Sequence, residues 1–312
     1  MNKITGFIAA VLLALGAGAV SAQTLGLGTT AGGANDAIGN SISQVVSSTS
    51  GMQMRPQKMS GTQQYIPLID AGKLEFGLSN VMQYYMAVSG TGLSKGQSYK
   101  NMRLAATIMP FYNGIFVRAN SGINTIADLK GKRLPSGYKS ATLFETFMVE
   151  FLRSANLTRK DVTNVPVVSL PQSWDLFKSG KVDAAIAAVG AGALKEIKAT
   201  VGDIKYLPIT PNPKMLENLP RTRFDVLQPA PNLVGINVPT TIHTYDYVVF
   251  VSASVKDDVV YKVVKALHDN AAALRKSTPL WNTFEPAQIG RDQQLPYHPG
   301  AVKFFREKGL VK

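Results

Sequence analysis

The chain of 312 residues contains no cysteine. This absence excludes disulfides, thiol nucleophiles and cysteine-ligated metal sites. Histidine is almost as scarce, because His243, His268 and His298 are the only three, and none has a metal-binding partner at suitable spacing on a helix face. We therefore expect no metal site. The sequence also lacks a nucleophile elbow, a phosphate-binding loop and a clear pair of catalytic acids, so we expect neither a cofactor nor an enzyme.

Acidic residues are few, with 20 Asp and Glu against 33 Lys and Arg, which gives a formal net charge of +13. The basic residues are spread along the chain, and the closest approaches to a cluster are Lys130, Lys132 and Arg133, and Arg221 with Arg223. No basic patch is interleaved with aromatic residues, so we expect no nucleic-acid partner. The excess charge fits either a solvated surface or a field that draws anionic ligands to the protein, and composition does not separate the two.

Long apolar runs are confined to the beginning of the chain. Lys3 precedes an apolar run from Phe7 to Val20, and the small residues Ser21 and Ala22 follow it. This pattern predicts a cleaved secretory signal peptide over residues 1–22 and export to the periplasm. The longest later run, Ala184 to Leu194, is interrupted by two glycines and is too short to span a membrane.

Two stretches of the chain resemble each other. Residues 68–79 and 176–187 both contain a Gly-Lys pair, at Gly72 and at Gly180, between a helical pattern and an alternating apolar pattern. Each predicts a helix closed by a left-handed glycine and then a strand. Two similar α/β units suggest two lobes with a crevice between them, which suits a mature chain of about 290 residues.

We therefore predict an α/β fold of two lobes, each a mixed sheet flanked by helices, with a ligand cleft between the lobes. Prolines become frequent between Pro208 and Pro239, as in irregular chain that returns from the second lobe to the first. The first lobe is predicted to comprise residues 23–113 and 236–312. The second is predicted to comprise residues 114–235, and the protein is expected to be a monomer.

Small polar residues follow several predicted strands, where open α/β sheets place ligands. They are Thr29, Thr30, Ser60, Thr62, Ser79, Asn80, Ser136 and Thr142. Hydroxyl groups and the free N–H groups of helix N-termini are suitable donors to a carboxylate or a similar anion. A glycine-rich turn from Gly26 to Gly33 lets the backbone approach a ligand closely, although tight helix packing explains it equally well.

Two larger side chains are further candidates. Arg103, near the end of a predicted strand, has the geometry to pair with a carboxylate, or else to form a surface or inter-lobe salt bridge. Tyr138 lies in a polar loop without a core pattern, and we expect it to line the cleft. Core packing is the alternative for it and for the other aromatic candidates Tyr84, Tyr85, Phe111, Tyr112 and Trp174.

The order of several motifs resembles a known family. The motifs are the glycine-rich turn, Ser60-Gly61-Thr62, Gly72 to Asn80, Ala127 to Arg133, Gly180 to Ala184 and Tyr297-His298-Pro299-Gly300-Ala301. Together they resemble the TAXI type of solute receptor, the TRAP-transporter-associated extracytoplasmic immunogenic proteins, over nearly the whole mature chain.

The resemblance implies a type II periplasmic-binding-protein fold that closes by a hinge around a small organic anion, such as glutamate, 2-oxoglutarate or an aromatic acid. It implies delivery of that ligand to a TRAP-type permease driven by an ion gradient. The ligand contacts that it implies are Thr29, Thr30, Ser60, Ser79, Asn80, Ser136, Gly137, Tyr138, Lys139, Ser140, Ala141, Gly190, Ala191 and Gly192. Tyr138 and Lys139 depart from the glycine- and serine-rich turn of the family, which favours an aromatic or more highly charged acid.

Other functions stay open at this point. The same fold serves receptors of ATP-driven importers for sulfonate-like or pyrimidine-like ligands, and it also hosts enzymes. A purely structural or adhesive surface protein fits the series of polar strand ends less well.

Overall fold

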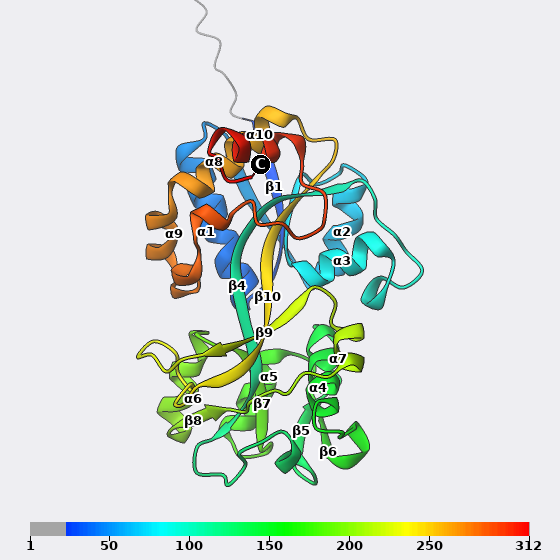
Figure 1. Ribbon diagram of the computed structural model, residues 1–312, viewed down its shortest axis with the longest axis vertical. Helices are drawn as coiled ribbons and strands as arrows, with labels where there is room; N and C mark the ends of the chain where they lie inside the picture. The colour runs from blue at the N-terminus through cyan, green and yellow to red at the C-terminus, as the bar shows by residue number, and fades with distance from the viewer. Residues whose placement is uncertain (1–22, 312) are drawn as a thin grey trace, which may run out of the picture.

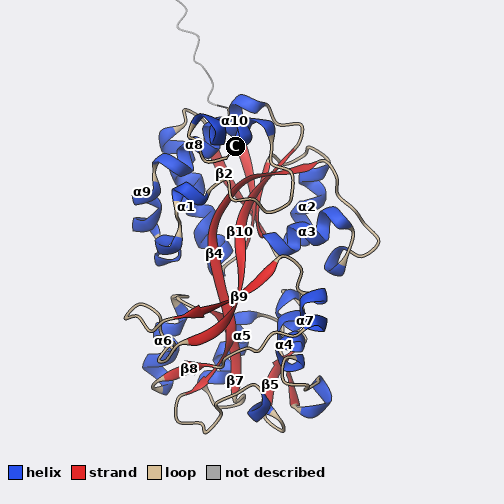
Figure 2. Ribbon diagram, viewed as in Figure 1, coloured by secondary structure: helices blue, strands red, loops and turns tan. Residues whose placement is uncertain are grey.

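The computed structural model describes residues 23–311, so the predicted signal peptide lies outside the described residues. Figures 1 and 2 show a long molecule whose strands run through the middle and whose helices cover them on the outside. This arrangement confirms the α/β fold with mixed sheets flanked by helices. Within residues 23–311, no helix combines the length and apolar character that crossing a membrane requires.

The main sheet has eight strands, in the order β2-β1-β3-β10-β4-β7, with β8 paired to β4 and β9 paired to β10. Strands β5 and β6 form a separate parallel pair. The strands are β1 (Thr24–Thr30), β2 (Gln53–Met59), β3 (Phe76–Asn80), β4 (Met102–Arg118), β5 (Arg133–Ser136), β6 (Thr163–Pro166), β7 (Ala184–Ala188), β8 (Ile204–Tyr206), β9 (Thr222–Leu227) and β10 (Thr240–Ser252). Strands β1, β2 and β3 are parallel, whereas β10 is antiparallel to both β3 and β4.

The helices fall into two groups in Figure 1, with α1–α3 and α8–α10 at the top and α4–α7 at the bottom. Their bounds are α1 (Gly33–Thr49), α2 (Thr62–Asp70), α3 (Val81–Ser89), α4 (Leu143–Arg153), α5 (Leu170–Lys178), α6 (Ala193–Val201), α7 (Pro213–Asn218), α8 (Asp257–Asp269), α9 (Ala271–Ser277) and α10 (Pro299–Glu307). Short 3₁₀ turns lie at Gly92–Ser94, Ala127–Leu129, Arg159–Asp161, Pro279–Thr283 and Pro286–Gln288.

The two resembling stretches fold alike. Helix α2 is followed by Gly72 at φ 69° and by β3, and α5 is followed by Gly180 at φ 71° and by β7. Only glycine adopts this left-handed conformation without steric cost, so both predicted helix–glycine–strand corners are confirmed.

Two long strands, β4 and β10, connect the top and the bottom of the molecule (Figure 1). The sequence predicts two strands with a bend near Asn113 and Gly114, but β4 is one strand of 17 residues. Asn113 pairs in register with His243 of β10 on one side and with Ala188 of β7 on the other. Pairing on both edges keeps the backbone extended where local residue preference favours a turn.

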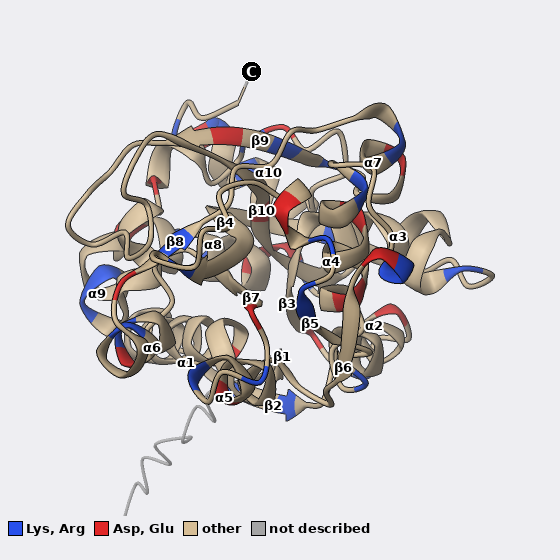
Figure 3. Ribbon diagram, turned by 90° about the horizontal axis from the view of Figure 1, so that it is seen from below, with Lys and Arg blue, Asp and Glu red and all other residues tan. Residues whose placement is uncertain are grey.

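The core follows this frame. A large cluster of buried apolar residues fills the upper part of the molecule and continues under α4. A smaller cluster lies between β4, β7, α5 and α6, and it includes Phe116, Phe177, Ala185 and Ala187. Every residue of β3 and most of β10 is buried on both faces, because helices cover both sides of the sheet. Apart from the buried Glu150 and Asp246, the charged residues of the described chain are exposed or half-buried. Figure 3 shows Lys and Arg distributed around the molecule among Asp and Glu.

Candidate functional site

A cleft with a volume of about 270 Å³ lies between the upper and lower groups of elements. Its upper wall is formed by residues 30–35, 60–63, Asn80 and Gln83. Its lower wall is formed by residues 140–144 and 169–171, Trp174, Ala188 and Ala191. Its back consists of Phe111, Asn113, Tyr245 and Tyr247, which come from β4 and β10. Ligand pockets span roughly 300–1,000 Å³, and this cleft lies just below that range, so it suits a small molecule.

Helix N-termini converge on the cleft from both walls. Helices α1 and α2 begin at its upper wall, and α4 and α5 begin at its lower wall. The first N–H groups of a helix have no partner within the helix, and they carry partial positive charge. Helices α1, α2 and α4 are preceded by Gly32, Gly61 and Thr142, and none of these residues caps its helix with a side-chain hydrogen bond.

The described residues that line the cleft include no Lys, Arg, His, Asp or Glu. An anion bound here is therefore held by N–H and hydroxyl donors rather than by a cationic side chain. Such donors carry no charge of their own, so they are also able to accommodate a neutral polar group.

Some polar side chains in the walls already serve the fold. The Asn80 carboxamide oxygen accepts a hydrogen bond from the Gln83 N–H at 2.7 Å, which caps α3. Asn35 accepts from the Thr30 N–H at 2.9 Å and donates to the Tyr247 hydroxyl at 3.2 Å. These bonds fix the turn before α1 against β10, so the upper wall is held in place.

The back of the cleft is aromatic. The ring of Phe111 lies 5.6 Å from that of Tyr245 and 5.1 Å from that of Tyr247, centre to centre. Burial raises the pKa of Tyr247 to about 12 and that of Tyr245 well above its ordinary value. Both phenols are therefore neutral at physiological pH, and they offer a flat, uncharged surface to a ligand.

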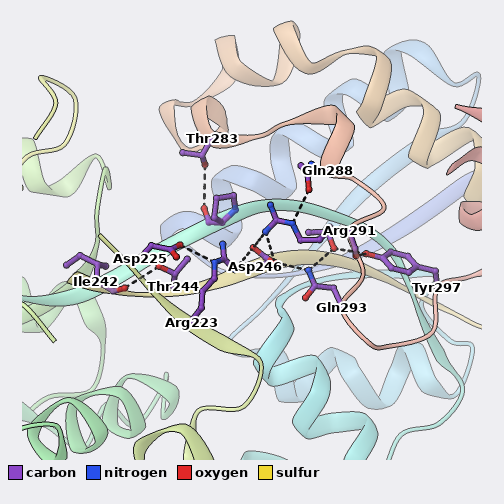
Figure 4. A network of polar contacts seen from close by, with 12 residues as sticks. Arg223, Asp225, Ile242, Thr244, Asp246, Thr283, Gln288, Arg291, Gln293 and Tyr297 are labelled. Carbon is purple, nitrogen blue, oxygen red and sulfur yellow. Dashed lines mark hydrogen bonds and ion pairs between the residues drawn. The ribbon is translucent and has the colours of Figure 1, made fainter. Parts of the chain in front are cut away.

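Behind the cleft, Asp246 anchors a network of polar contacts (Figure 4). Because side chains alternate along a strand, Asp246 faces away from the neighbouring Tyr245 and Tyr247. Its buried carboxylate accepts hydrogen bonds from Arg223 at 3.1 Å, from Arg291 at 3.3 Å and from Gln293 at 2.8 Å. The network ties β9 and the segment after α9 to β10.

The structure brings seven of the predicted site residues to the cleft wall. They are Thr30, Ser60, Thr62, Asn80, Ser140, Ala141 and Ala191. Nine do not line it, namely Thr29, Ser79, Arg103, Ser136, Gly137, Tyr138, Lys139, Gly190 and Gly192. Thr142 and the aromatic candidates Phe111 and Trp174 lie in the wall as well.

Physical reasons explain the residues that lie elsewhere. Tyr138 is fully buried against Phe144, with ring centres 6.0 Å apart, so the core alternative applies to it. Lys139 is exposed, and Arg103 donates to the carbonyls of Lys100 and Met102 at the far end of β4. Neither Arg103 nor Lys139 therefore lines the cleft.

The remaining six are held by local structure. Thr29 and Ser79 are buried, and each is the last residue but one of its strand, β1 and β3 respectively. Ser136 pairs with Pro166 in the separate sheet, and the Gly137 N–H donates to Glu145 at 2.8 Å. Gly190 and Gly192 belong to the turn before α6, of which Ala191 alone reaches the cleft.

Asn113, Gln83, Tyr245 and Tyr247 line the cleft but are absent from the sequence-based site. The signal for Asn113 in the sequence is a polar residue within an apolar stretch, and this pattern predicts a bend. Nothing local in the sequence distinguishes Tyr245 and Tyr247 from core tyrosines, because only the pairing of β10 decides which face they occupy.

A second, larger hollow of about 710 Å³ lies at the lower end, beside Arg118, Lys132, Arg133 and Asp183. Arg133 pairs with Asp183 at 2.5 Å, and Arg118 donates to the Phe177 carbonyl at 2.8 Å. These charges are largely satisfied within the protein, so the cleft between the two groups of elements is the better candidate site. Residues 23–311 contain no group of three or more His, Asp or Glu that is arranged to hold a metal ion.

Comparison with known proteins decides the family. The profile of the NMT1-like family matches residues 27–309. The chain belongs to the NMT1-like family. The match covers nearly all of the described residues, including both walls and the back of the cleft.

Solved structures resemble this NMT1-like protein over almost its whole length. A periplasmic transporter matches with a TM-score of 0.59 and 17% identity, over 94% of this chain and 95% of its own. MatC from Rhodopseudomonas palustris with bound malate matches with a TM-score of 0.59 and 13% identity, over 93% and 99%. PhnD1 from Prochlorococcus marinus in complex with methylphosphonate matches with a TM-score of 0.56 and 14% identity, over 93% and 99%. At these identities the likeness shows the fold of periplasmic solute-binding proteins.

Proposed function

We propose that this NMT1-like protein is a periplasmic solute-binding receptor that captures a small organic anion and delivers it to a membrane permease. The observation that carries the proposal is the cleft, where the N-termini of α1, α2 and α4 meet without side-chain caps beside the Ser169-capped α5, and where the described lining residues include no acidic side chain. The anions bound in MatC and PhnD1, malate and methylphosphonate, support this ligand class.

Binding would draw together two lobes, the first formed by residues 23–113 and 236–312 and the second by residues 114–235. Both walls of the cleft contribute donors, so a ligand bridges them and favours the closed arrangement. The resemblance of the sequence motifs to TAXI-type receptors supports delivery of the ligand to a TRAP-type permease. A receptor of an ATP-driven importer has the same fold and is the alternative.

The protein is proposed as a receptor rather than an enzyme. Among residues 23–311, those that line the cleft offer no carboxylate, imidazole or amine to act as a general acid or base. Turnover of a bound acid, followed by chromatography, would contradict this assignment.

Titration calorimetry of the mature chain tests the proposal with succinate, malate, glutamate, 2-oxoglutarate and benzoate, and with glucose and spermidine as uncharged and cationic controls. We expect binding of at least one acid. Trp174 lines the cleft and Trp281 is buried elsewhere, so a Trp281→Phe variant gives a fluorescence signal from the site alone. Binding of a control without any acid would overturn the proposal.

A further inference from the structure

Asn113 is a buried amide at the back of the cleft whose hydrogen-bonding groups are unused. Its side chain comes from β4, and the residue is 1% exposed. Within residues 23–311, ten buried side-chain nitrogen and oxygen atoms have no hydrogen-bond partner. Only two of these ten belong to a residue that lines the cleft, and they are the Oδ1 and Nδ2 atoms of Asn113.

The neighbours of Asn113 in the sheet do not supply the missing partners. Across one edge it pairs with His243, whose two ring nitrogens also lack partners, and across the other it pairs with Ala188. His243 lies among aromatic rings, with those of Phe147 and Phe151 at 5.1 and 5.4 Å. A buried amide without hydrogen-bond partners lowers the stability of the folded state. Because the sheet supplies no partner and Asn113 lines the cleft, a ligand in the cleft is positioned to supply one.

The chemistry of an amide restricts what that partner is. Asn113 offers an acceptor at Oδ1 and donors at Nδ2, so it is satisfied only by a group that both donates and accepts. A carboxylate accepts but does not donate, and it would leave Oδ1 unpaired. A carboxamide meets both atoms.

We propose that Asn113 determines ligand specificity and that the ligand is an organic acid with an uncharged carboxamide-like group at its far end. This inference rests on the proposed receptor function. The acid group lies at the helix N-termini, the carboxamide-like group contacts Asn113, and a flat body lies on Phe111 and Tyr245. Opening of the walls admits the ligand to the amide, which bulk water does not reach in the arrangement seen here.

The test compares three probes that share a benzoate body: 4-carbamoylbenzoate, 4-acetylbenzoate and terephthalate. The carboxamide of 4-carbamoylbenzoate both donates and accepts hydrogen bonds. The acetyl group of 4-acetylbenzoate only accepts, and so does the second carboxylate of ionised terephthalate. Calorimetry of the mature chain should give 4-carbamoylbenzoate an affinity about tenfold or more above the other two. In Asn113→Leu this preference should fall to within about threefold.

The apolar variant also has a stability readout. Replacing an unpaired buried amide by a side chain of similar size should raise the melting temperature of the ligand-free protein by about 2 °C or more. Asn40→Leu, on an exposed part of α1, is the matched control and should leave the preference unchanged.

The outcomes separate this inference from the receptor function. Equal affinities for the three probes in the wild type, a preference that survives in Asn113→Leu, or no binding of any of the three would each overturn the role of Asn113. The panel of acids under the proposed function is decided independently, because it contains no carboxamide. The wild-type comparison needs no variant to fold.

Discussion

The carboxylate of Asp246 on β10 lies 3.1 Å from the guanidinium of Arg223 on β9, and it is almost fully buried. Asp225 shares the same guanidinium at 3.1 Å but is 36% exposed. One arginine thus joins a buried and an exposed acid (Figure 4). The pair allows the contribution of burial to be measured on matched residues.

Asp246→Ala should lower the free energy of unfolding by about 2 kcal/mol, because two arginines and Gln293 lose a common buried acceptor. Asp225→Ala should cost about 0.5 kcal/mol, because solvent screens that pair. Urea denaturation of both variants measures the difference. Equal costs would show that the network does not depend on burial.

Thr62→Pro should weaken binding of the tightest acid of the panel about tenfold, because it removes the first N–H group of α2 from the upper wall. Proline is tolerated at this first helical position, and Gly61 before it is extended at φ −169° and ψ 160°. Thr62→Val keeps the N–H group and removes only the hydroxyl, so it is the control. An equal loss in both variants would assign the contact to the hydroxyl instead.

Gly300→Ala should destabilise the protein by about 3 kcal/mol, because the added Cβ would lie 2.1 Å from the Asp257 carbonyl oxygen at the start of α8. Gly192→Ala is the contrasting change, since Gly192 has helical angles and open space around it. It should alter stability by less than about 1 kcal/mol and leave ligand affinity unchanged. A large loss of affinity in Gly192→Ala would restore Gly192 to the binding site.

The dependence of stability on pH should decrease in His243→Phe. Burial lowers the pKa of His243 to about 3, below its unfolded value of 6.5. The folded state therefore holds fewer protons between these values, and stability is complete above about pH 6.5 and declines as the pH falls. From pH 7.5 to 5 the wild type should lose about 2 kcal/mol through this group. Urea denaturation at both pH values measures it, and an unchanged pH dependence in the variant would exclude His243 as the source.

Local patterns in the sequence predict many of the helix and strand ends of the fold. Gly72 and Gly180 mark helix ends because their left-handed backbone is a local property. Thr30 and Asn80 end β1 and β3, and Ser60 follows β2. They reach the cleft because these strands are parallel, and the ends of parallel strands meet at one edge of a sheet.

Other parts of the site depend on contacts between distant residues. Asn113 and Gly114 favour a turn, yet pairing with β7 and β10 extends them. Tyr138 lies in a polar loop, but α4 packs Phe144 against its ring. The motif from Tyr297 to Ala301 also has a structural explanation, because His298 caps α10 by accepting from the Gly300 N–H at 3.2 Å. Periodicity and spacing do not report such contacts.

The pairing of β4 with β10 shifts register between Tyr247 and Val248 and again between Val249 and Phe250. These irregularities begin beside the Tyr247 ring, which borders the cleft. Irregular pairing of this kind bends a strand and increases its local right-handed twist. The level at which the two long strands change their pairing and the surface that lines the cleft therefore share one residue, Tyr247.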